Sequence, residues 1–384
     1  MSDTPRLLLP PASHFFLLGP RGTGKSTWLK QAFPDALSID LLDPERERTL
    51  TARPELLGEQ VAALPSRRVV ILDEIQRVPS LLTVVHSLIE RKAGHRFVLT
   101  GSSARKLRRS GVDLLGGRAA RCSMHPFLAA ELGSSFDLPR ALRIGLVPGI
   151  MMATEPEQTL RAYAGLYLRE EIKAEGLVRN LASFSRFMEA MSLSQGQPLN
   201  LANVSRECEV SRATVTGYLE VLEDMLLSFR LPIFTRRAKR LLAAHPKFYW
   251  FDAGVFRSVR PSGPLDQPES IEGAAVESLV AQHLRGWIDY GDSDMMLSYW
   301  RTKSGSEVDF VIYGREGFWA IEVKNGRKVA QSDLRGLAAF HEDYPMAKRV
   351  LVYRGRERLR RDGVLCIPLV EFLLQIRPGH ELPS

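Results

Sequence analysis

The segment that most constrains this chain is Gly19-Pro20-Arg21-Gly22-Thr23-Gly24-Lys25-Ser26, which fits the phosphate-loop pattern G-x-x-x-x-G-K-[ST] without a mismatch. The apolar run HFFLL precedes it and the helical segment KSTWLKQAF follows it, as the pattern requires. The glycines let backbone N–H groups approach a phosphate, and the start of the helix adds partial positive charge. We therefore expect a nucleotide phosphate to bind between this strand and this helix.

Each polar residue of the loop has an expected task. Lys25 can reach the β- and γ-phosphates, and Ser26 can offer its hydroxyl oxygen to Mg²⁺. Thr27, the next residue of the helix, is the last residue that we expect to bind the nucleotide here. A second apolar strand ends in Asp73 and Glu74. Asp73 can hold Mg²⁺ directly or through water, and Glu74 can act as the general base on the attacking water. ATP and Mg²⁺ are therefore the expected cofactors.

Further candidates follow the next strand, Phe97-Val98-Leu99-Thr100. Thr100 and Ser102 can contact the γ-phosphate or the water, although a turn-forming role is an open alternative. Arg118 and Arg121 lie in LLGGRAAR, and an arginine near the γ-phosphate, in cis or from a neighbouring subunit, stabilises charge during transfer. Arg118 is preferred because two glycines can present it on a turn; an exposed surface pair is the alternative.

The order of elements predicts an α/β protein in three parts. Short strands and helices alternate up to about residue 135, which predicts a parallel sheet covered on both faces. The pattern is mostly helical from about 155 to 245 and mixed from about 268 to 375. A linker-like stretch, PSGPLDQP, lies between the last two parts. The expected domains are 1–150, 151–260 and 265–384.

The middle part contains a predicted helix-turn-helix within residues 201–222. Ser211 can cap the second helix, whose exposed side would enter a DNA groove. A two-stranded wing follows, with a basic run that contains no acid. The candidate nucleic-acid contacts are Arg212, Arg236, Arg237, Lys239 and Arg240. A helical packing or oligomerisation module is the equally weighted alternative.

The last part carries paired charges on predicted strands. Glu307 and Asp309 lie two residues apart and so point to one face, as do Glu322 and Lys324. Asp309 and Glu322 could hold Mg²⁺ through oxygen, and Lys324 could stabilise the nucleophile or developing charge. Glu277, in the preceding helix, could complete a nuclease site. An inherited fold without activity is the alternative.

Composition limits the partners and the compartment. There are 52 Lys and Arg residues against 44 Asp and Glu, a net charge of +8 that permits binding to a polyanion. The three cysteines, Cys122, Cys208 and Cys366, are far apart, which argues against a zinc cluster or a disulfide framework. No apolar run reaches the length of a membrane span, and the start is a poor signal peptide. We therefore expect a cytoplasmic protein that does not bind membranes.

Taken together, the motifs GPRGTGKS, VVILDEIQ, FVLTGSSARKL and LLGGRAARCSMHPFLAAEL, with the C-terminal ESLVAQHL, YWRTKSGSEVDFVI and AIEVK, resemble one family. It is the family of prokaryotic AAA-type P-loop ATPases that carry a C-terminal domain of unknown function. The resemblance spans nearly the whole chain. It implies an ATPase core, a winged-helix-like middle and a C-terminal domain of restriction-endonuclease-like fold.

The resulting hypothesis is an ATPase coupled to a nucleic-acid-binding, nuclease-like C-terminal region, with DNA favoured over RNA and homo-oligomers possible. The competing hypothesis is an ATP-regulated signalling or scaffold protein whose last two domains bind protein. A small-molecule kinase is disfavoured because no substrate-pocket motif accompanies the phosphate loop.

Overall fold

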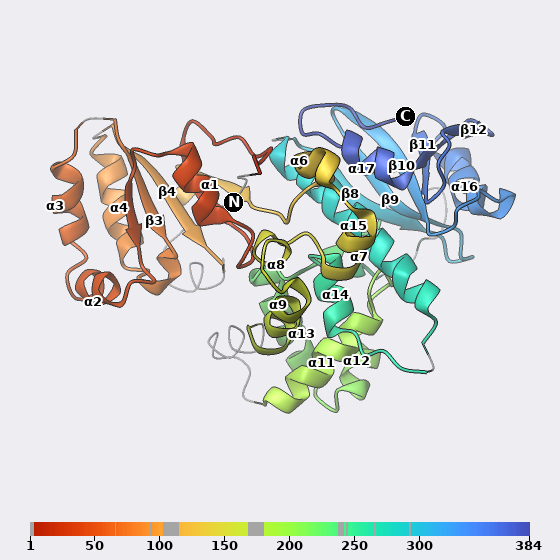
Figure 1. The fold of residues 1–384 in the computed structure, drawn as a ribbon, viewed down its shortest axis with the longest axis horizontal. Helices are drawn as coiled ribbons and strands as arrows, with labels where there is room; N and C mark the ends of the chain where they lie inside the picture. The colour runs from red at the N-terminus through yellow and green to blue at the C-terminus, as the bar shows by residue number, and fades with distance from the viewer. Residues whose placement is uncertain are drawn as a thin grey trace. The chain divides into compact units, whose positions relative to one another are not determined.

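Five parallel strands form the first sheet, in the order β2-β3-β4-β1-β5 (Figure 1). The computed structural model of the chain describes residues 4–65, 67–92, 94–102, 115–167, 180–236, 242, 245–264, 266–291 and 293–384. The strands of this sheet are β1 (His14–Leu18), β2 (Leu37–Asp40), β3 (Val69–Asp73), β4 (Arg96–Gly101) and β5 (Ala119–Ser123). Every strand pairing in it is parallel, as the alternating sequence pattern predicts.

The two faces of this sheet are covered by different helices. Alternate strand residues such as Phe16 and Leu72 share a core with α2 (Pro44–Ala52), α3 (Leu56–Ala62) and α4 (Leu81–Glu90). On the other face, the ring of Phe15 lies 6.4 Å from that of Trp28 in α1 (Lys25–Ala32). Burial on both faces explains why these strands read as continuous apolar runs rather than alternating ones.

The middle of the chain is mostly helical. It contains α6 (Ala129–Leu132), α7 (Leu138–Ile144), α8 (Pro148–Met151), α9 (Pro156–Ala162), α11 (Leu181–Leu193), α12 (Leu201–Glu207) and α13 (Arg212–Asp224). The rings of Phe184 and Phe187 lie 5.1 Å and 5.4 Å from that of Tyr218, which joins α11 to α13. The antiparallel pair β6 (Ser228–Leu231) and β7 (Lys247–Trp250) stands where the wing is predicted.

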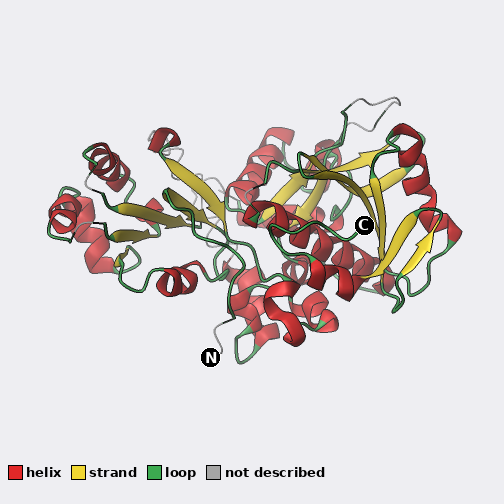
Figure 2. Cartoon of the chain, turned by 90° about the horizontal axis from the view of Figure 1, so that it is seen from above, coloured by secondary structure: helices red, strands yellow, loops and turns green. Residues whose placement is uncertain are grey.

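A second, six-stranded sheet forms the C-terminal part, in the order β12-β13-β11-β10-β9-β8 (Figure 2). Its strands are β8 (Met296–Arg301), β9 (Glu307–Gly314), β10 (Gly317–Lys324), β11 (Lys348–Tyr353), β12 (Leu359–Arg361) and β13 (Val364–Pro368). The helices of this part are α14 (Ala253–Val259), α15 (Pro268–Tyr290), α16 (Arg335–Asp343) and α17 (Leu369–Gln375). Strands β8, β9 and β10 are antiparallel neighbours, whereas β10, β11 and β13 run parallel.

The predicted α/β class, with a parallel sheet first, is confirmed, and the sheet of the last part contains both parallel and antiparallel pairs. The chain divides into two compact units, one made of Leu8–His125 with Glu223–Leu226 and the other of the remaining residues. The middle and C-terminal parts therefore share one unit, and the expected boundaries near 150 and 260 stay a prediction. None of the helices in the described part of the chain is long and apolar enough to cross a membrane.

Candidate functional site

The phosphate loop turns between β1 and α1 on backbone conformations that only glycine adopts readily. Gly22 and Gly24 have φ angles of 84° and 88°, in the left-handed region. A Cβ at Gly19 would lie 2.6 Å from the carbonyl oxygen of Met124, so this position has no room for a side chain. The loop glycines are therefore required by local geometry as well as by access to a phosphate.

Lys25, the first residue of α1, points back into the loop. Its side chain is buried, and Nζ donates hydrogen bonds to the carbonyl oxygens of Gly19 (2.7 Å) and Pro20 (3.3 Å). These carbonyls hold the ammonium beside the N–H groups of the loop. A phosphate bound by the loop would therefore lie next to this positive charge.

The ends of three neighbouring strands meet the start of α1. The hydroxyl of Ser26 donates to Oδ2 of Asp73 at 2.6 Å. The hydroxyl of Thr100, at the end of β4, donates to the other oxygen of the same carboxylate. Strand β4 lies between β1 and β3, so its last polar residue stands between loop and acid. A hydroxyl and a carboxylate are the hard oxygen donors that Mg²⁺ prefers, so this pair fits the expected metal.

Glu74 follows Asp73 with a φ of 59°, an uncommon conformation for a residue with a side chain. Its amide donates to the Thr100 hydroxyl at 3.0 Å, which fixes the turn. Its carboxylate accepts a hydrogen bond from the amide of Gln76, and the same amide nitrogen donates to the Ser102 hydroxyl at 3.3 Å. The structure thus brings Glu74 and Ser102 together through Gln76.

Sequence reasoning did not single out Gln76. The signal was available in VVILDEIQ, because a short turn after Glu74 returns a residue two positions later toward the end of the strand. Gln76 Oε1 is buried and has no hydrogen-bond partner among the described residues. This oxygen is an acceptor that the described residues leave unsatisfied near the strand ends.

Arg118 lies away from the phosphate loop of its own chain. It immediately precedes β5, and the register pairs Ala119 with His14 at the start of β1. The loop follows Leu18 at the other end of that strand. Arg118 forms an ion pair with Glu90 at the end of α4 instead. Arg121 pairs with Phe16 in mid-strand. A role of Arg118 in a neighbouring copy's site stays a prediction.

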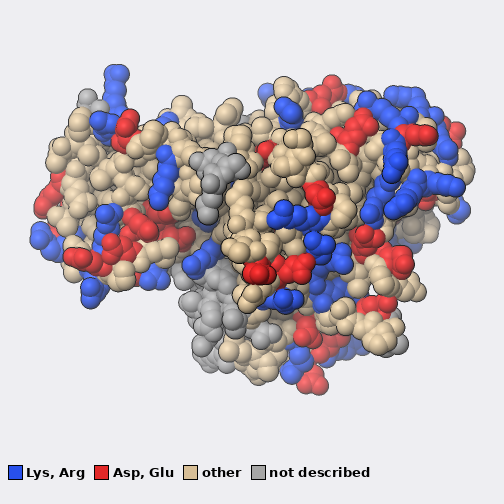
Figure 3. Space-filling view, in the orientation of Figure 1, with Lys and Arg blue, Asp and Glu red and all other residues tan. Residues whose placement is uncertain are grey.

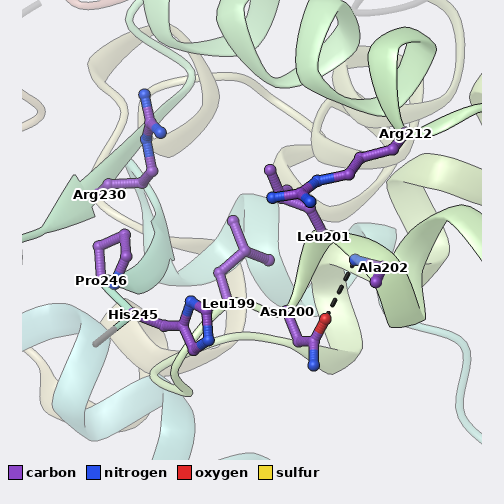
Figure 4. A pocket seen from close by; sticks show the side chains of 8 residues that line it. All are labelled: Leu199, Asn200, Leu201, Ala202, Arg212, Arg230, His245 and Pro246. Carbon is purple, nitrogen blue, oxygen red and sulfur yellow. Dashed lines mark hydrogen bonds between the residues drawn. The ribbon is translucent and has the colours of Figure 1, made fainter. Parts of the chain in front are cut away.

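The helix-turn-helix candidates flank a pocket of about 210 Å³ in the middle part (Figure 4). Ser211 begins α13 as predicted, because its hydroxyl accepts the amide of Thr214 at 3.1 Å. Figure 4 shows Arg212 and Arg230 on different walls, with His245 below. The other lining residues are Leu199, Asn200, Leu201, Ala202 and Pro246. No acid lines it. Arg236 is exposed, whereas the predicted contacts Arg237, Lys239 and Arg240 lie outside the described residues.

The predicted nuclease residues Glu277, Asp309, Glu322 and Lys324 come from α15, β9 and β10. Pairing of Ile321 with Phe310 places Asp309 and Glu322 on adjacent strands, as expected. Lys324 donates to Glu322 Oε1 at 2.6 Å. Sequence reasoning missed Lys247 of β7, whose ammonium lies 3.2 Å from Glu277 and 3.4 Å from Asp309.

Burial dominates the electrostatics of these acids. It raises the pKa of Glu277 to about 7, although Lys247 acts in the opposite direction. Burial, reinforced by the neighbouring Asp309, raises the pKa of Glu322 to about 8. The pKa of Lys247 is raised well above its ordinary value, because nearby acids outweigh the effect of burial. The lysine is therefore held as a cation.

Family comparisons cover the chain in three consecutive segments. Residues 12–133 match the family model of the AAA domain. Residues 272–372 match a domain of unknown function (DUF4143), and residues 135–266 match another (DUF8612). The chain therefore contains one segment that matches the AAA domain and a C-terminal segment that matches DUF4143. The AAA match contains the phosphate loop, Asp73, Glu74 and Ser102.

The chain is similar along most of its length to proteins of two bacteria. It is 26% identical over 380 residues to the uncharacterized protein Rv2008c of Mycobacterium tuberculosis, covering 96% of this chain and 82% of that protein. It is 21% identical over 341 residues to an uncharacterized protein of Haemophilus influenzae, covering 84% and 81%.

Solved structures with similar segments include a signal-transduction ATPase with a tetratricopeptide repeat sensor from Pyrococcus horikoshii. It is 11% identical, with a TM-score of 0.23, over 72% of this chain and 45% of that chain. The replication initiator DnaA, bound to AMPPCP and single-stranded DNA, is 14% identical with a TM-score of 0.26, over 55% and 82%. These scores are too low to carry an argument about function.

Proposed function

We propose that the protein binds and hydrolyses ATP at the phosphate loop. The observation that carries this proposal is the contact of Ser26 and Thr100 with the two oxygens of the Asp73 carboxylate, beside the ammonium of Lys25. Four side chains from three separate stretches of sequence converge here. Lys25 is a residue type that binds phosphate, and Ser26 and Asp73 provide the oxygens expected to hold Mg²⁺. Thr100 is a polar residue at the end of the strand between them.

Each residue of this site has a separate role in the proposed hydrolysis. Lys25 exchanges its loop carbonyls for phosphate oxygens, which carry more negative charge. Ser26 and Asp73 would hold Mg²⁺, which neutralises charge on the phosphates when bound. Glu74 takes a proton from the attacking water, while Thr100 fixes its backbone. Ser102 and Gln76 keep the Glu74 carboxylate oriented.

An ATPase assay on matched lysine variants tests this proposal. Lys25→Ala should abolish hydrolysis and strongly weaken ATP binding, because the phosphates lose their nearest cation. Lys30→Ala removes an exposed lysine one and a half turns further along the same helix and should leave both unchanged. Hydrolysis by Lys25→Ala at the wild-type rate would contradict the proposal that ATP is hydrolysed at the phosphate loop.

We also propose that the compact unit that contains the middle and C-terminal parts, here called the C-terminal unit, binds the phosphate backbone of a nucleic acid, with DNA favoured. Arg212, Arg230 and His245 line a pocket whose described lining residues include no acid. Lys and Arg side chains also gather at the upper right of Figure 3, over the region that carries β11 and β12 in Figure 1. The exposed ones in this region include Arg327, Lys328, Lys348, Arg356, Arg358, Arg360 and Arg361. Binding to labelled duplex DNA that weakens steeply with salt is the expected result.

The competing function is an ATP-regulated scaffold whose nuclease-like part binds protein. One observation favours a catalytically silent C-terminal part: the ammonium of Lys247 lies among its acids. Absence of salt-dependent binding to duplex, junction and single-stranded DNA and to RNA would select this function, while ATP hydrolysis would be unaffected by the outcome.

A further inference from the structure

The acids of the C-terminal part surround an amino group supplied by the middle part. Lys247 is the first residue of β7, and its side chain is only 1% exposed. Its Nζ lies 3.2 Å from Glu277 Oε1, 2.5 Å from Glu307 Oε1 and 3.4 Å from Asp309 Oδ1. The acids come from α15 and β9, so one ammonium joins three elements.

The same three acids make further contacts with the chain. Asp309 Oδ2 accepts the amide of Val323 at 2.9 Å. Glu277 Oε1 accepts the hydroxyl of Tyr249 at 2.5 Å. Glu307 Oε2 lies 3.3 Å from Arg301. The carboxylates are thus oriented toward cations and donors of the protein itself.

Glu322, the second expected metal ligand, points to another cation. Its Oε1 accepts from Lys324 at 2.6 Å, and its buried Oε2 has no hydrogen-bond partner among the described residues. Within the same residues, no group of three His, Cys, Asp or Glu side chains has an arrangement that could hold a metal ion. The residues present therefore do not fit the Mg²⁺ expected at Asp309 and Glu322.

Electrostatics explains why the Lys247 ammonium and a divalent metal ion would exclude each other. A buried ammonium cannot act as a metal ligand, and a divalent ion among the same three carboxylates would repel it at short range and low dielectric. Removing either the lysine or its acids leaves buried charge without compensation. The lysine and a divalent ion are alternative occupants of one site.

We infer that Lys247 is the resident cation of the acidic site, that it excludes a divalent metal, and that the site fixes β7 against the C-terminal sheet rather than cleaving phosphodiesters. This inference goes beyond ATP hydrolysis and nucleic-acid binding and depends on neither. It assigns a positioning role to a residue that lies outside the D…E-x-K pattern.

Manganese titration of the full-length protein, without nucleotide or DNA, tests the inference. Free Mn²⁺ is followed by electron paramagnetic resonance for the wild type, Asp309→Asn, Lys247→Ala and the double variant. The wild type and Asp309→Asn should bind Mn²⁺ equally. Lys247→Ala should gain one Mn²⁺ site, and the double variant should lose it. Lys303→Ala, which removes an exposed lysine in the β8–β9 turn, should match the wild type.

Two results of this titration would overturn the inference. One is wild-type Mn²⁺ binding that weakens about tenfold or more in Asp309→Asn, because the metal site would then exist beside the lysine. The other is a folded Lys247→Ala that gains no site. Where Lys247→Ala does not fold, the comparison of wild type with Asp309→Asn still decides. DNA cleavage with Mn²⁺ that Asp309→Asn abolishes would also overturn it.

Discussion

The hydroxyl of Ser26 donates a hydrogen bond of 2.6 Å to Oδ2 of Asp73, although 47 positions separate the two residues. The contact exists because β1, which leads into the phosphate loop, and β3 end at the same edge of a parallel sheet. Only β4 lies between these two strands. Thr100, at the end of the intervening strand, contacts the same carboxylate. The sheet topology therefore assembles the polar site from three strand ends.

Replacement of Asp73 tests the metal side of this site. Asp73→Asn should reduce Mg²⁺-dependent ATP hydrolysis by about 10²-fold, because one charged oxygen ligand is lost. Nucleotide binding in EDTA should be unchanged, since Lys25 and the loop remain. The control is Asp40→Asn, at the exposed end of β2 in register with Asp73. Equal Mg²⁺ dependence in both variants would argue against Asp73 as a metal-side residue.

Replacement of Glu74 separates binding from chemistry. Glu74→Gln should keep Mg²⁺-ATP affinity within about twofold and slow turnover by about 10²–10⁴-fold, the usual contribution of a general base. Nucleotide binding and phosphate release are measured on the same preparation. Glu45→Gln, on the exposed side of α2, is the matched control. Normal phosphate release by Glu74→Gln would exclude the carboxylate as the base.

The phosphate loop was predictable because its information is local. A strand, a run of glycines and a helix start are contiguous, and their chemistry needs no distant partner. Asp73 was predictable because it ends an apolar strand. Arg118, expected near a γ-phosphate in its own chain or in a neighbouring copy, lies away from the loop of its own chain, because the register of β5 with β1 places it beside the start of β1. The turn that brings Gln76 back is short, yet its conformation depends on a positive φ at Glu74.

Lys247 could not be placed from sequence. In the basic run it is one of six positive residues, and nothing local distinguishes a buried ammonium from a solvated one. Its acids lie at positions 277, 307 and 309, so their convergence depends on the packing of α15 and β9 against β7. Long-range packing of this kind leaves no periodicity or spacing signal in the chain.

The middle pocket gives a prediction for nucleic-acid binding. Arg212→Ala with Arg230→Ala should weaken binding to duplex DNA and lower the salt slope by about 1–2, because up to two phosphate contacts are lost. The loss should be similar across sequences, since phosphate contacts carry little sequence information. Arg257→Ala, an exposed arginine in the last turn of α14, is the control. Unchanged slopes would favour the protein-binding alternative.

Lys247 also makes a prediction about stability. Lys247→Met leaves buried carboxylates without their cation, which typically costs about 3–5 kcal/mol. We expect the melting transition of the C-terminal unit to fall, whereas Lys303→Met should leave it in place. Differential scanning calorimetry resolves the transitions of the two units. Equal transition temperatures for Lys247→Met and wild type would show that the ammonium contributes little to the packing of β7.

The last prediction concerns His283, which is fully buried in α15. Its Nε2 accepts the amide of Ala129 at 2.8 Å, so the ring proton lies on Nδ1, 2.7 Å from the carbonyl oxygen of Leu279. Burial lowers the pKa of His283 to about 4, well below its ordinary value of 6.5. A second proton would displace the Ala129 amide and place a charge in the core.

The sign of the pH dependence follows from that pKa. Between pH 6.5 and pH 4 the unfolded chain binds a proton at this histidine and the folded chain does not, so stability falls as the pH falls. The loss from pH 7 to pH 4 is on the order of 3 kcal/mol. His283→Asn should be less stable at pH 7 but should lose this slope, whereas His380→Gln, an exposed histidine, should keep it. Denaturant melts at several pH values measure the difference, and parallel curves for wild type and His283→Asn would show that the ring titrates normally in the folded state.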